Sequence, residues 1–283
     1  MAPMYECRSR AVDRVDVSAQ IIARKRGGSA VQSMFRTALS EGLWLAAEPL
    51  SRRVRSSRAH RRRLAPIILS MTLPRNKLIA AIVVNVIVVA FEVWAMYYGI
   101  NKHGVAGNFI FYTECSNLFG AIACAICAIA EVRQLRGGPG CSRWVRWLKY
   151  ASSCCLLMTL FVVVFILTPM LYYIEQPGFY LMFIDGAKPI THLGAPLAVT
   201  ASYVIFEADR GMTLKQSLVG FVPTLVYAAV AYPCNIARVW DGPYPFFQVW
   251  TMPVWMSVLW FVALFLLSFG LCQIPRLLAR RVS

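Results

Sequence analysis

Six long apolar runs constrain this chain more than any other feature of its sequence. Each run carries at most one formally charged residue and is close to the roughly 20 residues that an α-helix needs to cross the hydrocarbon core of a bilayer. Backbone N–H and C=O groups in lipid must be hydrogen-bonded within the protein, and these runs are too long for barrel strands, so they predict helices. The runs span residues 78–99, 109–130, 151–174, 189–206, 217–233 and 254–272. The expected fold is therefore an all-α polytopic membrane protein with six transmembrane helices.

The net charge of +16 follows the topology of these runs. Cations gather before residue 78, in alternate loops and in the tail, whereas the remaining loops hold one cation each, Lys102, Lys188 and Arg238. Cytoplasmic loops carry an excess of Lys and Arg, so this alternation predicts cytoplasmic N and C termini. The basic loops contain Arg133, Arg136, Arg143, Arg146 and Lys149 after the second run, and Arg210 and Lys215 after the fourth.

Residues 1–70 differ in composition from residues 71–283, which form the six-helix domain. The first segment is rich in Arg, Ser and Ala and has no spanning run, which predicts a basic, disordered extension lying on anionic membrane lipids. An alternative is that translation begins at Met71, directly before the first helix. No nucleic-acid-binding motif accompanies the charge, so no nucleic-acid partner is expected.

The cysteines do not predict a metal site or a disulfide framework. Most of the nine lie within the apolar runs, and their spacing matches no zinc or haem pattern. Cys124 and Cys127 form a C-x-x-C pair, but small residues at such positions commonly serve close helix packing. We expect no metal and no cofactor.

Polar residues from separate runs are expected at one depth near the outer face. The second and fourth helices both start outside, which places Thr113 and His192 about one turn inside the membrane. Nothing comparable is expected at the inner face within the spans. The residues expected at the outer depth are Glu92, Thr113, Asn117, His192 and Asn235.

These polar residues have a packing interpretation and a functional one. Thr113, Ser116, Asn117, Gly120, Cys124 and Cys127 form one helical stripe, and small or polar stripes join membrane helices. His192 is the one histidine within a span. An ionisable residue there indicates proton transfer or ligand binding, unless its imidazole is neutral and bonded to a backbone carbonyl or to Thr113.

Three sequence segments resemble a family of bacterial six-helix integral membrane proteins that has no assigned activity. They are "FYTECSNLF" at the start of the second helix, "ITHLGAPLAV" in the fourth, and "FVPTLVYAAVAYPCNIARVWDGPYPFF" from the fifth helix onward. The resemblance extends in order over nearly all of residues 78–272. It implies a multi-pass protein of the bacterial cytoplasmic membrane.

More distantly, the layout is similar to the androgen-induced and androgen-dependent membrane hydrolases of animals, which cleave fatty acid esters of hydroxy fatty acids. That resemblance implies Thr113 as nucleophile and His192 as base. This chain has Leu193 and Gly194 where the animal proteins carry further polar residues. The fold is therefore a safer inference from this resemblance than the activity.

If this chemistry applies, His192 takes the proton of the Thr113 hydroxyl and later activates water, while Asn117 donates to the oxyanion. Ser116 is the alternative donor, and Ser116, Glu92, Tyr112 and Asn235 are the expected substrate-binding residues. The expected ligand is an acyl ester or another amphiphile. The alternative functions are a non-enzymatic binder or carrier of a small amphiphile, and a structural or regulatory membrane protein.

The basic-loop pattern makes a prediction about topology. A cysteine at position 102 (Lys102→Cys) should react with an impermeant thiol reagent added outside intact cells, and a cysteine at position 136 (Arg136→Cys) should not. The wild-type protein controls for the native cysteines. The opposite labelling pattern would invert the orientation.

Overall fold

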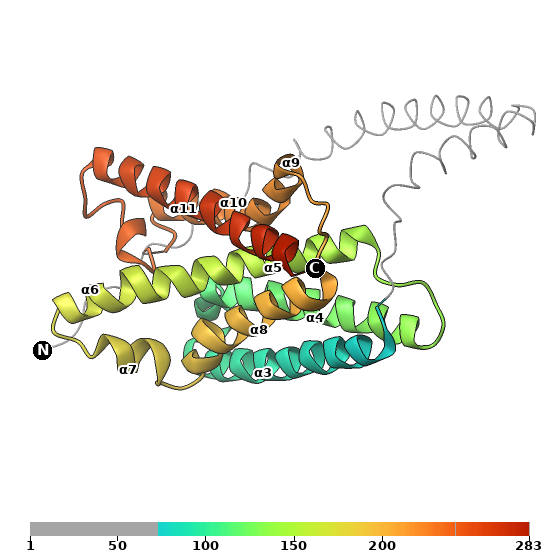
Figure 1. Ribbon diagram of the computed structural model, residues 1–283. Helices are drawn as coiled ribbons and strands as arrows, with labels where there is room; N and C mark the ends of the chain where they lie inside the picture. The colour runs from blue at the N-terminus through green and yellow to red at the C-terminus, as the bar shows by residue number, and fades with distance from the viewer. Residues whose placement is uncertain (1–72, 241, 283) are drawn as a thin grey trace, which may run out of the picture. The chain divides into compact units, whose positions relative to one another are not determined.

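The computed structural model describes residues 73–240 and 242–282, and this part of the chain is helical. It contains six helices that are long and apolar enough to cross a membrane, which confirms the expected number of spans (Figure 1). The expectations of a disordered extension over residues 1–70 and of a translation start at Met71 lie outside the described residues. The six spans are Arg75–Asn108, Tyr112–Leu135, Arg143–Tyr173, Pro189–Glu207, Leu214–Ile236 and Val254–Arg281.

Three of the spans are single α-helices and three are composite. The single ones are α3 (Arg75–Asn108), α4 (Tyr112–Leu135) and α11 (Val254–Arg281). The third span joins α5 (Arg143–Val162), η1 (Val163–Leu167) and α6 (Thr168–Tyr173), and the fourth joins η2 (Pro189–Gly194), α8 (Ala195–Ser202) and η3 (Tyr203–Glu207). The fifth joins α9 (Leu214–Ser217), η4 (Leu218–Phe221) and α10 (Val222–Ile236). The short helices α7 (Gly178–Phe183) and η5 (Pro245–Phe247) lie between spans.

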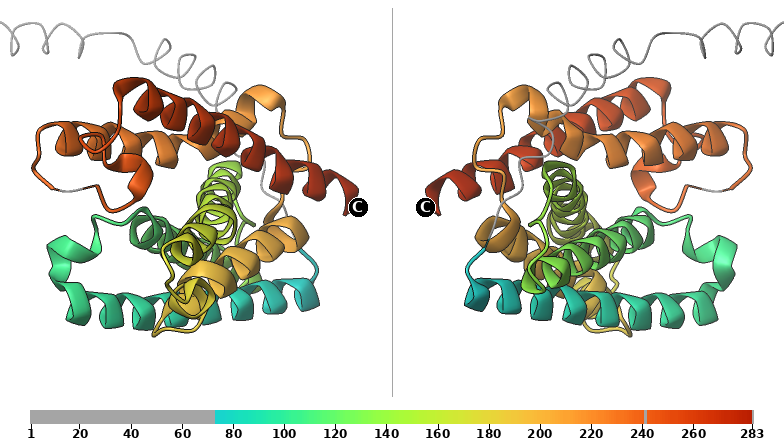
Figure 2. Two further views of the ribbon diagram at one scale, coloured as in Figure 1. Left: turned by 90° about the vertical axis from the view of Figure 1, so that its left-hand side faces the viewer. Right: turned by 90° about the vertical axis from the view of Figure 1, so that its right-hand side faces the viewer.

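Helix α5 runs through the middle of the bundle. Figure 2 shows α10 and α11 on one side of it and α3 and α8 on the other, and α4, α8, α10 and α11 all contact α5. Its central residues are small and buried, Ser152, Ser153, Cys154 and Cys155 among them. Small side chains allow close approach of membrane helices, which explains why α5 can accept neighbours on most of its surface.

Prolines mark the irregular turns within the spans. Pro169 follows the π-helical turn η1, Pro196 follows the π-helical turn η2, and Pro223 follows the 3-10 turn η4. Proline lacks the N–H that would continue the helical ladder. Beside the first of these sites the Thr168 hydroxyl donates to the Val163 carbonyl oxygen at 2.7 Å, which also accepts from the Thr168 N–H, so this polar side chain is satisfied within its own helix. Local π and 3-10 turns of this kind let membrane helices tolerate proline.

Helix α3 extends beyond the predicted end at residue 99. Its regular geometry breaks at Gly104, which has a φ of 71°, a conformation that glycine adopts at little cost. The apolar run ends earlier because the last turns of α3 are polar and protrude from the apolar segment. Hydropathy therefore located the span but not the end of its helix.

The outward faces of the spans are apolar. Val86, Phe91 and Val93 on α3, and Val258, Leu259 and Leu266 on α11, are each more than half exposed. Large continuous apolar surfaces are unusual on water-soluble proteins, whereas hydrocarbon solvates them without cost. The exposed surface therefore agrees with an integral membrane protein.

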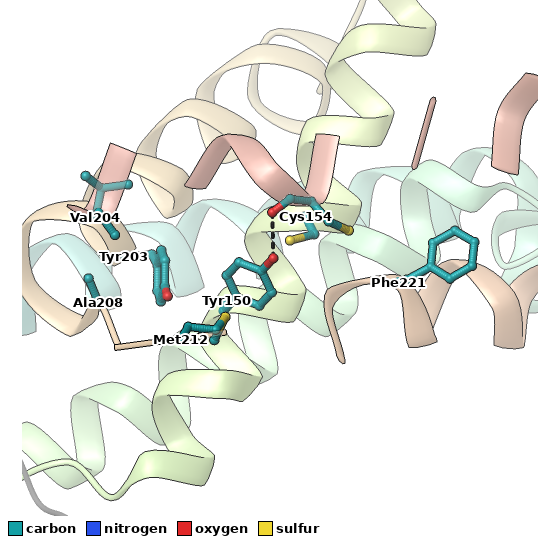
Figure 3. Packing of buried hydrophobic residues seen from close by; sticks show 9 residues of the cluster. Tyr150, Cys154, Tyr203, Val204, Ala208, Met212 and Phe221 are labelled. Atoms are coloured by element: carbon teal, nitrogen blue, oxygen red, sulfur yellow. Dashed lines mark hydrogen bonds between the residues drawn. The ribbon is translucent and has the colours of Figure 1, made fainter. Parts of the chain in front are cut away.

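One packed cluster joins α5 to the later spans. Figure 3 shows Tyr150 of α5 beside Cys154, Tyr203 and Met212, and the Tyr150 hydroxyl donates to the Cys272 carbonyl oxygen of α11 at 2.5 Å. The ring is fully buried, so this hydrogen bond satisfies the one polar atom of an otherwise apolar side chain. It fixes α11 against α5.

The predicted stripe on α4 faces the bundle interior. Ser116, Gly120, Cys124 and Cys127 are all buried. A Cβ added at Gly120 would lie 2.9 Å from Cδ1 of Leu156, and Leu156 is itself fully buried on α5. Gly120 is thus the point of close approach between α4 and α5.

Gly120→Leu should lower the melting temperature of the purified protein, because overpacking a tight contact costs about 1–3 kcal/mol. The matched control is Gly270→Leu on α11, where an added Cβ meets no atom within 4 Å. Thermal unfolding in detergent, followed by tryptophan fluorescence, measures both. Equal melting temperatures for the two variants would contradict the contact.

Candidate functional site

A cavity of about 570 Å³ lies where α3 ends and α4 begins. Side chains from α3, α4, α6, the α7–η2 region and the loop before η5 form its wall, and we call it the Thr113 cavity. Thr113 and His192, the predicted nucleophile and base, both line it. The structure therefore brings together two residues that are 79 positions apart in the sequence.

Thr113 occupies a position shared by two cavities. A second, smaller cavity of about 70 Å³ has an almost entirely apolar wall that includes Met158, Phe221 and Phe265. Thr113 and Tyr244 line both cavities. A group bound beside the Thr113 hydroxyl would thus meet a larger space with several polar groups in its wall on one side and an almost entirely apolar space on the other.

Tyr244 holds the start of α4. The N-cap residue Phe111 makes no side-chain cap hydrogen bond, and the Thr113 N–H donates instead to the Tyr244 hydroxyl at 3.4 Å. Burial raises the pKa of Tyr244 to about 12, and hydrogen bonds with Thr113 offset part of that rise. The hydroxyl therefore stays neutral and supplies the acceptor that the first turn of a helix lacks.

His192 is buried, and its ring orientation is defined. Its Nδ1 lies 2.6 Å from the Met182 carbonyl oxygen. A carbonyl oxygen only accepts hydrogen bonds, so Nδ1 carries the proton and Nε2 of the neutral ring is an acceptor. His192 therefore has the backbone-bonded imidazole that the packing interpretation expects. The same side chain also lines the Thr113 cavity.

Asn117 and Ser116 do not line the cavity. The Asn117 amide donates from Nδ2 to the Thr191 carbonyl oxygen at 3.1 Å, next to His192, while its buried Oδ1 has no hydrogen-bond partner in the described part of the chain. The Ser116 hydroxyl donates to the Thr113 carbonyl oxygen at 2.9 Å and lies 2.9 Å from the Thr159 hydroxyl. Both residues position Thr113 and η2, and the oxyanion role of Asn117 stays a prediction.

The other predicted binding residues are dispersed. The Tyr112 hydroxyl lies 2.8 Å from the Thr224 hydroxyl, and its side chain lines the small apolar cavity. Glu92 is buried on α3 without lining either cavity, and its Oε1 has no hydrogen-bond partner among the described residues. Asn235 bonds within α10 to the Ala231 carbonyl oxygen, and its own carbonyl accepts from Trp250. Asn235 thus braces the loop after α10 instead of contributing to the cavity.

The charged rim of the Thr113 cavity was not predicted from the sequence. Asp185 pairs with Lys102 at 3.5 Å and with Lys188 at 3.4 Å, and all three side chains are partly exposed. Burial alone would raise the pKa of Asp185, but the two ammonium groups outweigh that effect and hold it below its usual value. In the sequence, Lys102 and Lys188 indicate only orientation. They are also isolated cations in sparsely charged loops, and that isolation is the sequence signal for a charged rim.

The expectation that the opposite end of the spans lacks a comparable polar group is wrong. Asn85, Glu131, Lys149 and Glu207 are buried together there. Three of them lie one or two residues outside the predicted apolar runs, at points where charged side chains recur in the sequence. They are buried because the helices continue past these runs within the bundle.

No family model matches this chain, and no curated protein or solved structure matches it either. The family membership inferred from the three segments stays a prediction. Within residues 73–240 and 242–282, no group of three or more His, Cys, Asp and Glu side chains is placed to hold a metal ion. The site is therefore interpreted from its own geometry.

Tyr244→Phe should weaken the start of α4, since loss of a hydrogen bond costs about 1 kcal/mol. We expect a lower melting temperature and faster hydrogen–deuterium exchange in the first turn of α4. Tyr97→Phe, which changes an exposed tyrosine of α3, is the matched control. Unchanged exchange at Thr113 would show that the Tyr244 hydroxyl does not hold this turn.

Proposed function

We propose that this membrane protein binds an amphiphile in the Thr113 cavity. The observation that carries the proposal is the division of the site into a partly exposed rim with Lys102, Lys188 and Asp185 and an apolar cavity behind Thr113. Ligand sites are typically concave, largely apolar, and fitted with a few polar groups that fix orientation. A polar head at the rim and an acyl chain in the apolar cavity would suit both parts.

The expected location of this site is the outer face of the membrane. The alternation of basic loops supports that orientation, because the loops at this end hold few cations. The ligand would then come from the outer leaflet or from the aqueous phase outside. Orientation is tested by the cysteine labelling described above.

Binding can be measured with a fluorescent fatty acid added to the purified protein. Met170→Trp, which places a larger ring in the wall of the Thr113 cavity, should weaken binding by about tenfold or more, equivalent to about 1.4 kcal/mol. Met256→Trp on α11 introduces the same ring outside both cavities and should leave binding unchanged. Equal affinities for the two variants would reject the cavity as the binding site.

Hydrolysis of an acyl ester is a second candidate, favoured by the ring orientation of His192. Thr113 Oγ would attack the ester carbonyl carbon as its proton passes to Nε2, and the alcohol would leave with that proton. Water that gives a proton to the same nitrogen would then release the acid and restore Thr113. The Met182 carbonyl, held by Nδ1–H, would stabilise the imidazolium between the two steps.

No hydrogen bond joins Thr113 to His192 in the described structure. Catalytic hydrogen bonds commonly tighten only when substrate is bound, so their absence leaves the proposal open to a direct test. The motif resemblance is the further support for this reaction. The Asn117 side-chain amide already donates one N–H to the Thr191 carbonyl oxygen. Its second N–H would have to donate to the oxyanion.

The hydrolase proposal predicts that Thr113→Ala and His192→Ala each abolish cleavage of a long-chain p-nitrophenyl ester and labelling by a fluorophosphonate. A nucleophile and its base act as a unit, so each loss should be nearly complete. Thr200→Ala on α8, outside both cavities, is the control and should retain activity. Loss of folding in both test variants, or full activity in either one, would favour a packing role for these residues.

A further inference from the structure

A second polar site lies inside the bundle, at the end of α4 opposite to Thr113. Asn85 of α3, Glu131 of α4, Lys149 of α5 and Glu207 of η3 have at most 1% of their surface exposed. Ionisable side chains are costly within a membrane domain and mark functional positions by default. The residues come from four different helical segments, so their meeting is a product of the tertiary fold.

The Asn85 amide bridges the two carboxyl groups. Its Nδ2 donates to Glu131 Oε2 at 3.1 Å and to Glu207 Oε1 at 2.9 Å, which uses both of its N–H groups. Lys149 Nζ donates to Asn85 Oδ1 and, at 3.0 Å, to Cys124 Sγ. The Ser202 hydroxyl lies 3.0 and 3.2 Å from the two Glu207 oxygens and can donate to one at a time.

The donors in this site are too few for two ionised carboxylates. Glu131 Oε1 has no hydrogen-bond partner in the part of the chain described, and Lys149 Nζ is 3.9 Å from Glu207 Oε1, beyond hydrogen-bond distance. Both carboxyl groups accept from the same Asn85 nitrogen, at 3.1 and 2.9 Å, so the two accepting oxygens lie within about 6 Å of each other. Two ionised carboxylates that close together, and out of water, would repel each other strongly.

We propose that Glu131 and Glu207 share one exchangeable proton and form a proton-binding site between α4 and η3. The arrangement follows the general behaviour of close carboxyl pairs, in which like charges so near to each other do not both ionise. With the proton bound, the pair carries one negative charge and Lys149 one positive charge. The ligand of this site is thus the proton itself.

The other titratable groups near the pair are consistent with this assignment. Cys124 and Cys127 face it from α4, and Cys141 from the turn before α5. Burial and the two nearby carboxyl groups raise the pKa of Cys141 to about 12, so that thiol adds no charge. Glu92 interacts with Cys124 from α3, and Arg146, one turn before Lys149, interacts with Cys141, Tyr203 and Asp209.

The bound proton should stabilise the packing of α3, α4 and η3. Exposed carboxyl groups in the unfolded chain release their protons near pH 4.3, whereas the folded pair keeps one above that pH. The folded state then binds one proton more than the unfolded state, so stability falls as pH rises. In this window the unfolding equilibrium constant should grow about tenfold per pH unit.

Infrared spectroscopy of protein labelled with ¹³C-glutamate tests the proposal directly, because a protonated carboxyl group has its own C=O band. At neutral pH the wild-type spectrum should contain this band, and Glu131→Gln and Glu207→Gln should each reduce it. Glu175→Gln, in an exposed turn, is the matched control and should leave it unchanged. Glu92→Gln identifies any contribution from the third buried glutamate.

Absence of a protonated glutamate band in the wild-type protein would overturn the proposal. So would a band that persists unchanged in both cluster variants. If the glutamine variants fail to fold, Glu131→Asp keeps a carboxyl group but withdraws it by one methylene and carries no ¹³C-glutamate label. The labelled band should then weaken or shift in frequency, and an unchanged band would show that its proton lies elsewhere.

Discussion

The requirement that every backbone polar group in a membrane find its partner within the protein underlies this structure. Helices, with π and 3-10 turns near the prolines, meet it for six spans, and the Thr168 hydroxyl beside Pro169 bonds to the Val163 carbonyl oxygen of its own span. The same requirement applies to side chains, since lipid offers no hydrogen bonds. Polar groups are therefore turned inward, and the surrounding surface is left to Val, Leu, Ile and Phe.

Helix α5 shows how inward polarity and close packing are combined. Its Ser152 and Ser153 hydroxyl groups donate to the Lys149 carbonyl oxygen, so they occupy little space and leave no free donor. Gly120 of α4 then approaches Leu156, and the Tyr150 hydroxyl reaches α11. These contacts set the positions of α4 and α11, and through α4 the position of Thr113.

Helix α4 carries functional candidates at both of its ends. Thr113 in its first turn lines the cavity proposed to hold an amphiphile, and Glu131 in its last turn belongs to the proposed proton site. The two sites have different chemistry, because one opens to a charged rim and the other is closed to solvent. The two proposals rest on different contacts and are tested by different measurements.

The sequence by itself determined the number of spans, the inward stripe of α4 and the pairing of Thr113 with His192 in one region. These features depend on hydropathy and helical period, which are local properties. Only the tertiary structure decided that Asn117 bonds to Thr191, that Asn235 bonds within α10 and to Trp250, and that Asn85 joins Glu131 to Glu207. The physical reason is that a hydrogen bond depends on atomic positions within a few tenths of an ångström, and those are set by which helices pack against which. Composition placed the buried carboxyl groups and Lys149 at the edges of apolar runs, but helix packing brought them together out of water.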